Sequence, residues 1–409
     1  MKYLFFIFFC YMLIISCNKP ETTNPVPPPA TDSFTVSINN GYGSGRYKAG
    51  DTVHIFSQAY SSSQLFGSWS GNDVSLLNAP DEWHTWFIMP KKNVNFSGSS
   101  LNISSFTLNF EKIKGRDRLK PVYYYFPAGH KGIVYLLHGT GGNAAFLVAD
   151  YEWQLLINDL VNNKFALIVT ESEEATTNTD LNSDGVLRWN TTPWDTVSNI
   201  DYANIRIITD TFYNRGLTSN SEPKYSIGMS NGGNFSTALS TIYNFRAGVS
   251  YCAPSGTPIA QVTNTPLQFC MARFDNNPSV GSAGNANALS NSRMMTGRGI
   301  CSKYFTKERS PLYPERFARR GDISVSQSAA VFNEIKAAHL LDAKNYFIGY
   351  SDALKSALNA TPSAFPQLSS LNVSQQNFVI TQIDLAVSDH KMYSDFNRAT
   401  LLFLTKQCQ

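Results

Sequence analysis

Gly228-Met229-Ser230-Asn231-Gly232 is the most informative motif in this sequence. It matches G-x-S-x-G, the turn that holds a nucleophilic serine between a strand and a helix. Residues 224–227 have the composition of a short buried strand, and residues 234–240 can continue as a helix. Glycine suits both ends of so tight a turn, because a side chain there has no room. The alternative interpretation is a glycine-rich turn that only caps a helix.

The composition is that of a globular protein with a large core. The chain has 409 residues, enough for two or three domains, of which 43% are hydrophobic and 13% aromatic. Its 33 basic and 30 acidic residues leave a formal charge of +3. A basic block and a repeated aromatic–basic pattern are both missing from the sequence, so nucleic acid is not an expected partner.

The first residues have the pattern of an export signal. Lys2 precedes an apolar run over residues 3–15, and the run ends in Ile14-Ile15-Ser16-Cys17, which resembles a bacterial lipobox. We expect residues 1–16 to be a lipoprotein signal peptide and Cys17 to carry the lipid, which anchors the exported protein to a bacterial membrane, at the outer membrane or the cell surface. A transmembrane anchor is the alternative, but the run is shorter than the ~20 residues that span a bilayer.

Two segments precede the larger domain. Residues 17–32 are rich in Pro and Thr, which predicts an extended tether. Residues 33–99 alternate apolar and polar positions around turn clusters, which predicts a small all-β module. The stretches G-S-G-R-Y-K-A-G-D-T-V-H-I (43–55), F-G-S-W-S-G-N (66–72) and F-I-M-P-K-K-N-V (87–94) resemble the internalin B-repeat, which implies a spacer or adhesion unit without chemistry. The tryptophans of the module are expected to fill its core rather than to form a sugar-binding face: Trp69, Trp83 and Trp86.

From residue 100 onward, strand patterns alternate with helix patterns. The strands are expected at 122–126, 133–137, 165–170, 224–227, 247–251 and 267–272, and the helices at 144–163, 199–213 and 234–240. A further helix pattern covers 329–341, and a strand pattern covers 379–387. This alternation predicts that residues 100–409 form an α/β domain with a mostly parallel sheet flanked by helices. Sites in such sheets lie at the carboxyl ends of the strands.

A serine becomes a good nucleophile only when a base takes its proton, so Ser230 requires a histidine. Two histidines follow it along the chain. His339 lies in a helix pattern and is expected to be a surface or packing residue. His390 follows the strand pattern at 379–387 and precedes the last helix, and we predict that it is the base. A solvated loop histidine is the alternative.

The base needs a carboxylate that fixes its tautomer, placed in a loop just beyond a strand. Asp275 has this position after the strand at 267–272. Asp384 is expected inside a strand, and Asp389 is too close to His390 in the chain to bend back to it. We therefore predict Asp275 as the acid, with a surface carboxylate as the alternative.

Acyl transfer also requires N–H donors for the developing oxyanion, each worth roughly 3–4 kcal/mol in the transition state. One expected donor is the backbone N–H of Asn231, the residue after the nucleophile. The other belongs to the loop at 138–143 that follows an earlier strand, where Thr140 is the expected donor. His138 is expected to be a structural hydrogen-bonding residue.

Six short motifs together resemble a family of extracellular esterases. They are H-G-T-G-G-N (138–143), R-W-N (188–190), D-Y-A-N-I (201–205), Y-S-I-G-M-S-N-G-G (225–233), Y-C-A-P-S-G (251–256) and D-H (389–390). Over most of 105–409 the chain is similar to polyhydroxybutyrate depolymerases and to feruloyl and acetylxylan esterases of the carbohydrate esterase family one type, which are α/β-hydrolases. The resemblance implies a triad of Ser230, Asp275 and His390. Many relatives have His-Gly shortly before the acid, where this chain has Met271-Ala272-Arg273-Phe274, and residues 279–317 are expanded, as a lid or one wall of a cleft would be.

These observations predict a secreted, lipid-anchored serine esterase that acts through an acyl-enzyme. The expected substrates are acetyl or feruloyl esters on polysaccharide, and a polyhydroxyalkanoate or another polyester is the alternative. A serine peptidase and a non-catalytic surface adhesin are the alternatives from other classes. The chemistry itself requires no cofactor.

One loop has the beginning of a calcium-binding pattern, Asp180-Leu181-Asn182-Ser183-Asp184-Gly185. Alternate oxygen-bearing side chains before a glycine suit Ca²⁺, so Asp180, Asn182 and Asp184 are candidate ligands of a structural ion. Thr191 stands where the closing glutamate is expected, and an Asx-rich turn is the alternative. Trp189 and Trp194 follow this loop and are candidate substrate-binding residues.

Four cysteines remain after the signal and the lipidation position: Cys252, Cys270, Cys301 and Cys408. An exported protein can form disulfides, and four cysteines allow three pairings. Cys252 and Cys270 lie in strand patterns, so buried free thiols are the competing interpretation. The sequence contains no C-x-x-C or Cys/His spacing that suggests zinc.

Overall fold

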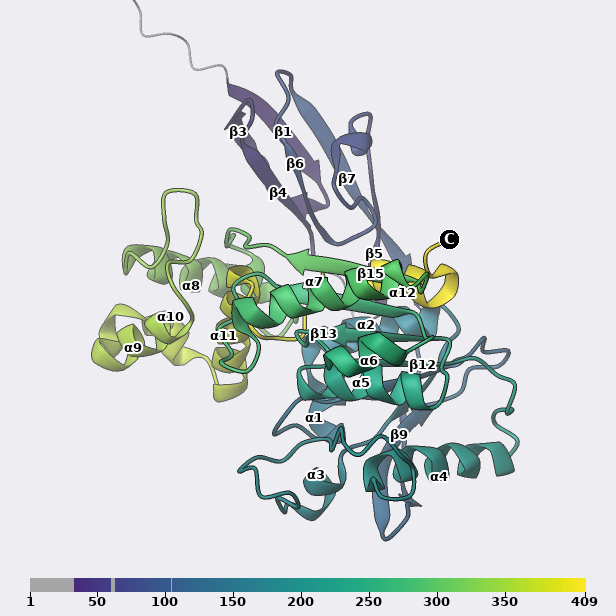
Figure 1. The fold of residues 1–409 in the computed structure, drawn as a ribbon. Coiled ribbons are helices and arrows are strands. Elements are labelled where there is room, and N and C mark those ends of the chain that lie inside the picture. Colours follow the sequence, from purple (N-terminus) through teal and green to yellow (C-terminus); the bar gives the residue numbers. More distant parts are fainter. Residues whose placement is uncertain (1–32, 60–62, 104) are drawn as a thin grey trace, which may run out of the picture.

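The computed structural model describes residues 33–59, 63–103 and 105–409, and Figure 1 shows a small β module followed by a larger α/β domain. The predicted signal peptide, Cys17 and the tether lie outside the described residues. None of the helices within the described ranges has the length and apolarity that crossing a bilayer requires.

In the described part of the chain, the α/β domain has one eight-stranded sheet in the order β8-β9-β11-β10-β12-β13-β14-β15. All neighbouring pairs from β11 to β15 are parallel, whereas β8 and β9 are antiparallel additions at one edge. This order and direction define the α/β-hydrolase fold. The strands are β8 (Asn109–Lys114), β9 (Leu119–Tyr125), β10 (Ile133–Leu137), β11 (Ala166–Val169), β12 (Lys224–Met229), β13 (Ala247–Tyr251), β14 (Leu267–Ala272) and β15 (Ser302–Lys307).

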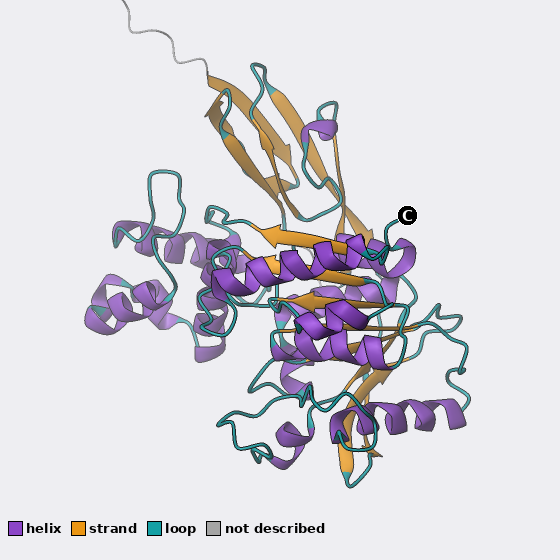
Figure 2. Cartoon of the chain, viewed as in Figure 1, coloured by secondary structure: helices purple, strands orange, loops and turns teal. Residues whose placement is uncertain are grey.

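Helices cover both faces of this sheet (Figure 2). Successive side chains of a strand point to opposite faces, so strands that are covered on both sides are apolar throughout. In β10, Val134 and Leu136 contact the core under α1, α2 and α12, whereas Tyr135 and Leu137 contact the core under α4 to α7. The helices are α1 (Ala144–Ala149), α2 (Tyr151–Asn162), α3 (Glu173–Thr177), α4 (Ile200–Asn214), α5 (Asn231–Ile242), α6 (Thr257–Val262), α7 (Gly281–Gly297), α8 (Val325–Ala337), α9 (Asp352–Ala360), α10 (Pro366–Ser370), α11 (Val373–Val387) and α12 (Asn397–Lys406).

Helices α8 to α11 form an insert between the last strand of the sheet and the segment that carries His390. Figure 1 shows it projecting to one side of the sheet. Its own core includes Leu312, Phe332, Phe365 and Ile383. The region 279–317, which the sequence suggests as a lid or cleft wall, is mostly α7 and β15 of the main domain, and only its first residues reach the cleft described below.

The strand predicted at 379–387 is wrong, because these residues belong to α11. Asp384 therefore lies in a helix. Asn372 and Gln375 start this helix with reciprocal side-chain hydrogen bonds to the backbone. The apolar run misleads because its last residues are buried between the insert and the main domain, and a helix buried on several sides has no clear helical period. Similarly, the single helix expected at 144–163 is two helices that meet at Asp150.

The β module contains a four-stranded sheet in the order β3-β1-β7-β5 and a three-stranded sheet in the order β2-β4-β6 within the described ranges. Their shared core includes Trp69 and Trp83, as expected, and also Tyr313 of the α/β domain, whereas Trp86 is half-buried. The strands are β1 (Ser33–Asn39), β2 (Gly41–Tyr42), β3 (Gly45–Lys48), β4 (Thr52–Ser57), β5 (Gln64–Ser70), β6 (His84–Ile88) and β7 (Val94–Asn102).

Two of the four cysteines form a disulfide, and the other two are buried free thiols. Cys301, just before β15, is joined by a disulfide to Cys408, just after α12. Cys252 and Cys270 are free thiols that are buried in the core.

Candidate active site

The turn after β12 places Ser230 at the carboxyl end of the central strand. Ser230 has φ 57° and ψ −126°, a conformation that side chains rarely adopt and that costs about 1–3 kcal/mol. A Cβ atom on Gly228 would lie 1.9 Å from the carbonyl oxygen of Gly232, and one on Gly232 would lie 2.3 Å from the carbonyl oxygens of Leu137 and His138. Strand and helix therefore approach so closely that only glycine fits at both positions.

The structure brings together the three side chains that the sequence predicts for a triad. The hydroxyl of Ser230 lies 2.8 Å from Nε2 of His390, and Nδ1 of His390 lies 2.7 Å from Oδ2 of Asp275. A carboxylate can only accept, so the Nδ1–H group donates to Asp275, and Nε2 is left to accept the serine proton. The carboxylate side chain of Asp275 is fully buried, and the imidazole is 13% exposed. This arrangement can deprotonate a hydroxyl and return the proton.

Ser388 and Asp389, which the sequence analysis does not assign to the site, hold the histidine and aspartate loops together. The hydroxyl of Ser388 accepts from the N–H of Arg273 (2.9 Å) and donates to the carbonyl of Lys307 (2.7 Å). Oδ1 of Asp389 accepts from the N–H of Asn276 at 2.9 Å. The same oxygen also accepts from the backbone N–H of His390 at 2.6 Å, so Asp389 joins the backbone of the histidine loop to that of the aspartate loop. In the sequence, the only indication of this role is that both residues stand directly before His390.

Backbone N–H groups line the cleft at the serine. In the loop after β10, the N–H of Gly141 donates to the carbonyl of Leu187, outside the loop, and the N–H of Gly142 donates to the carbonyl of Gly139. Among the described residues, the N–H groups of Thr140 and Asn231 have no hydrogen-bond partner. A Cβ atom on Gly139 would lie 3.3 Å from Cβ of Ser230, so this loop lies directly against the turn. Thr140 and Asn231 line the same cleft as Ser230, and their role as oxyanion donors stays a prediction.

His138 has a structural role. Its Nε2 accepts from the N–H of Ser172 at 3.1 Å, and its Nδ1 lies 2.7 Å from the carbonyl of Gly139. Burial lowers the pKa of His138 to about 4, so the ring is neutral at neutral pH. Both ring nitrogens are therefore used to fix the loop that carries the free amide of Thr140.

We expect the His138→Gln variant to show how much the protonation of His138 contributes to the pH dependence of stability. The pKa in the folded state lies below the ordinary value of 6.5, so the unfolded chain binds a proton that the folded chain does not. The stability that neutral His138 contributes is present above pH 6.5 and is lost toward pH 4, at about 1.4 kcal/mol per pH unit. Urea unfolding between pH 7 and pH 4.5 should give a stability difference between the two proteins that narrows with acidification. A difference independent of pH would contradict this.

Trp189 is not positioned to bind substrate, contrary to the prediction. It is 1% exposed, stacks on Phe235 and packs at a tilt against His138. Its indole N–H donates to the carbonyl of His138 at 3.0 Å, and its backbone exchanges hydrogen bonds with the side chain of Asn231. Trp189 therefore supports both loops that carry the free amides. Trp194 is 39% exposed and lies outside the cleft.

The two tryptophans should differ strongly on truncation. Trp189→Ala removes a buried ring and is expected to cost about 3–5 kcal/mol of unfolding free energy. Trp194→Ala, the matched exposed control, is expected to cost less than about 1 kcal/mol. Denaturant unfolding of both variants is the measurement, and equal losses would contradict the burial difference.

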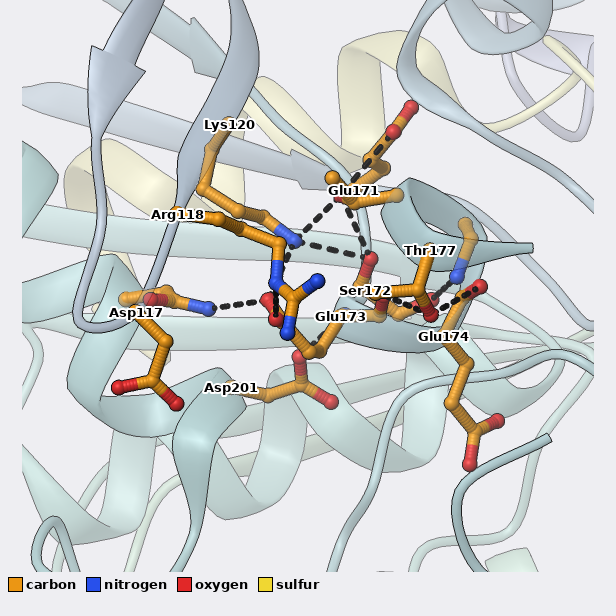
Figure 3. A network of polar contacts seen from close by, with 12 residues as sticks. Asp117, Arg118, Lys120, Glu171, Ser172, Glu173, Glu174, Thr177 and Asp201 are labelled. Atoms are coloured by element: carbon orange, nitrogen blue, oxygen red, sulfur yellow. Dashed lines mark hydrogen bonds and ion pairs between the residues drawn. The ribbon is translucent and has the colours of Figure 1, made fainter. Parts of the chain in front are cut away.

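A buried ionic network fixes the segment that contains Trp189 (Figure 3). Glu173 pairs with Arg118 and with Lys120, whose Nζ lies 3.0 Å away, and its N–H donates to Asp201 at 2.7 Å. Asp201 also accepts from the N–H of Asn190 at 2.8 Å, and burial raises the pKa of Asp201 to about 6. The D-Y-A-N-I and R-W-N motifs are thus joined by hydrogen bonds behind the serine turn.

A cleft of about 640 Å³ opens at Ser230. One part of its lining is apolar, and Phe146 is 72% exposed there. Arg188 and Lys391 also line the cleft, each paired with a carboxylate. The remaining apolar lining residues include Val186, Met229, Val280 and Met392.

The predicted calcium loop is held by its own hydrogen bonds. The carboxylate of Asp180 accepts from the N–H groups of Gly185 and Asp184, and Oδ1 of Asn182 also accepts from the latter. Asp184 pairs with the guanidinium of Arg188, so that carboxylate would have to leave a partner to bind an ion. The geometry fits an Asx-rich turn, and calcium binding stays a prediction. If the ion binds, calorimetric titration of the chelator-treated protein with Ca²⁺ should release or absorb heat, and Asp180→Ala should abolish the signal.

One group of metal-ligating side chains lies close together in the described ranges: Cys252, Asp275 and His390, whose ligand atoms all lie within 4.8 Å of one another. Hydrogen bonds already occupy them. The imidazole bonds to Ser230 and Asp275, and the thiol of Cys252 lies 3.4 Å from the carbonyl oxygen of Lys391.

The chain was compared with protein-family models, curated proteins and solved structures. No protein-family model matches the sequence, and no curated protein matches it. Among solved structures, the chain is similar to a dienelactone hydrolase from Anabaena variabilis, at 13% identity over 50% of this chain and 88% of the other, with a TM-score of 0.39. It is also similar to an esterase from Pyrococcus furiosus, at 12% identity over 50% of this chain and 86% of the other, with a TM-score of 0.36. A ferulic acid esterase matches at 10% identity over 50% of this chain and 90% of the other, with a TM-score of 0.37. The fold assignment rests on the strand order given above.

Proposed function

We propose that this chain is a serine hydrolase of carboxylic esters. The observation that carries the proposal is the unbroken chain of two hydrogen bonds, 2.8 Å and 2.7 Å long, from Ser230 through His390 to Asp275. At the Ser230 end of this chain, Thr140 and Asn231 line the same cleft with N–H groups that have no partner among the described residues. Nucleophile, base, orienting carboxylate and oxyanion donors are the four parts that acyl transfer to serine needs.

The mechanism follows from these positions. Oγ of Ser230 attacks the ester carbonyl while Nε2 of His390 takes its proton, and the buried carboxylate of Asp275 stabilises the imidazolium. The N–H groups of Thr140 and Asn231 bind the oxyanion. His390 then protonates the leaving alcohol, which leaves an acyl-enzyme. Water, deprotonated by His390, releases the acid and regenerates Ser230.

The substrates we propose are acetyl or feruloyl esters on polysaccharide. The apolar lining around Phe146 suits an acyl group, and the amide side chains of Asn143, Asn234 and Asn277 on the same cleft suit a hydroxylated leaving group. A polyhydroxyalkanoate is the second candidate, because an exposed phenylalanine at the cleft also suits an apolar polymer. We further propose that residues 1–16 direct export and that Cys17 carries a lipid, which would hold the enzyme at a membrane surface beside an extracellular polymer.

Two experiments test the proposal. A fluorophosphonate probe should label the protein once, at Ser230 by peptide mapping, and an unlabelled protein would favour a non-catalytic adhesin. A panel of acetylated xylan, methyl ferulate, short polyhydroxyalkanoates and a peptide substrate should give turnover on esters. Cleavage of the peptide alone would replace the proposal by a serine peptidase.

A further inference from the structure

The β module packs against the chain just beyond the proposed base. Residues 390–399, here called the base segment, run from His390 to the first turn of α12. The sheet domain fixes the beginning of this segment through the hydrogen bonds of Ser388 described above. Its far end contacts the module through Glu82 and His84. Figure 1 shows the module and α12 together near the β15 edge of the sheet.

Glu82 supplies the helix cap that α12 lacks. Helix α12 starts after Phe396, which has no side chain that can accept from the first turn. The carboxylate of Glu82 accepts instead, from the N–H of Ala399 at 3.0 Å and from that of Arg398 at 3.4 Å. Glu82 is 5% exposed, and its carbonyl accepts from the indole N–H of Trp69 in the core of the module. A negative or polar acceptor at this position satisfies donors that the helix leaves open.

His84 bonds to Asp395 inside the base segment. Nδ1 of His84 lies 2.7 Å from Oδ1 of Asp395, and Nζ of Lys307 from β15 lies 2.7 Å from the same oxygen. On its other side, Nε2 of His84 lies 3.0 Å from Nδ1 of His54. Asp395 is 5% exposed, so it is a buried carboxylate held between the sheet and the module. Lys307 supplies the charge that compensates this carboxylate. Burial lowers the pKa of His84 to about 4, so the neutral ring donates a hydrogen bond, and its removal leaves the buried carboxylate one donor short.

The module reaches the middle of the segment through a cation–aromatic stack. The guanidinium of Arg319 lies 3.6 Å from the centre of the Trp83 ring and donates to Glu152 at 3.2 Å. Glu152 in turn accepts from the N–H of Ser394 at 3.1 Å. Arg319 and Glu152 are both nearly buried, so this chain of contacts is shielded from water.

We propose that the module positions His390, and that Glu82 and His84 are the positioning residues through which it acts. The inference rests on the proposed function. His390 must stay within hydrogen-bond distance of both Ser230 and Asp275, and a displacement of about 1 Å in such a group can cost a hundredfold in rate. The sheet holds the segment before the imidazole, and the module holds it after. This role differs from the spacer or adhesion role that the sequence resemblance implies.

The test compares two substitutions of one residue in the full chain. His84→Leu removes the donor to Asp395, whereas His84→Asn keeps an N–H group near the place of Nδ1. With p-nitrophenyl acetate, His84→Leu should lower kcat by about tenfold or more, with KM changed less than about twofold, and shift the pH profile of kcat/KM. His84→Asn should restore most of kcat. The matched control is His130→Ala, which removes another histidine–carboxylate pair, to Glu222, before β10 at the opposite end of the sheet.

The outcomes separate positioning from stability. Circular dichroism and thermal unfolding report whether each variant is folded at the assay temperature. If His84→Leu is not folded, Glu82→Gln, which preserves volume but presents an amide N–H₂ group to one helix N–H, takes its place with the same expectations. Wild-type kcat with an unshifted pH profile in a folded variant would overturn the proposal. So would a loss of the same size in His130→Ala.

Failure of the proposed function would look different. In that case the wild-type protein would neither turn over esters nor react with fluorophosphonate. The imidazole resonances of His390, assigned by comparison with His390→Gln, would still report its position. They should shift in His84→Leu and stay unchanged in His130→Ala. Unchanged resonances in both variants would overturn the positioning role whatever reaction the protein catalyses.

Discussion

Ser230→Ala is expected to lower kcat for p-nitrophenyl acetate by about 10⁵- to 10⁶-fold. The hydroxyl of Ser230 is the group in hydrogen-bond contact with His390, and the members of a triad act as a unit, so the loss of the nucleophile removes nearly all of their joint effect. The residual rate would come from the oxyanion donors and from substrate binding. Stopped-flow or steady-state measurement of p-nitrophenolate release gives the size of the loss in kcat.

The control is Ser356→Ala, which changes an exposed serine on α9 in the insert. It should retain wild-type kcat and KM. Thermal unfolding should show that Ser230→Ala is about as stable as the wild type, because alanine keeps the Cβ atom and loses only a hydroxyl in the cleft. A Ser230→Ala rate within tenfold of wild type would exclude Ser230 as the nucleophile.

Gly228→Ala is expected to prevent stable folding, at a cost above about 4 kcal/mol. The new Cβ atom would lie 1.9 Å from the carbonyl oxygen and 2.2 Å from the carbonyl carbon of Gly232, and both belong to the backbone of α5. A flexible side chain could move aside, but the first turn of a helix packed under the central strand cannot move without separating β12 from α5. Urea unfolding, or the yield of folded protein, is the measurement.

Gly297→Ala is the matched control for this substitution. Gly297 is the last residue of α7, and a Cβ atom there would meet no heavy atom within 4 Å. Alanine is the better helix former by about 1 kcal/mol, so this variant should be as stable as the wild type or slightly more stable. Wild-type stability of Gly228→Ala would show that the backbone of Gly232 lies farther from residue 228 than it does in this structure.

The sequence is sufficient to predict six of the eight strands of the sheet, all except the two edge strands β8 and β15, and the meeting of the three triad positions. Short apolar runs bounded by turns mark strands that are buried on both faces, and the tight glycine turn has few other uses. The order of Ser230, Asp275 and His390 along the chain then places each of them after a strand or before the last helix. These features are local, so they can be read without knowledge of the tertiary contacts.

The errors arise where distant segments decide the outcome. Trp189 follows a polar loop, which predicts exposure, but Asp201 and Glu173 fold that loop onto the back of the serine turn and bury the ring. The strand predicted at 379–387 fails because the insert covers a face that a surface helix would leave polar. The contacts of Glu82 with α12 join residues more than three hundred positions apart, and no sequence pattern in either segment predicts them.

The disulfide between Cys301 and Cys408 gives the end of the chain a particular topology. It closes a covalent ring across a sequence separation of 107, and both the helical insert and His390 lie inside it. Closure of a loop of this size lowers the entropy of the unfolded chain by the equivalent of about 4–5 kcal/mol. A single cut anywhere in the insert would open the ring but leave both pieces in one molecule, so proteolytic nicking there would not detach the imidazole from the sheet that carries the serine.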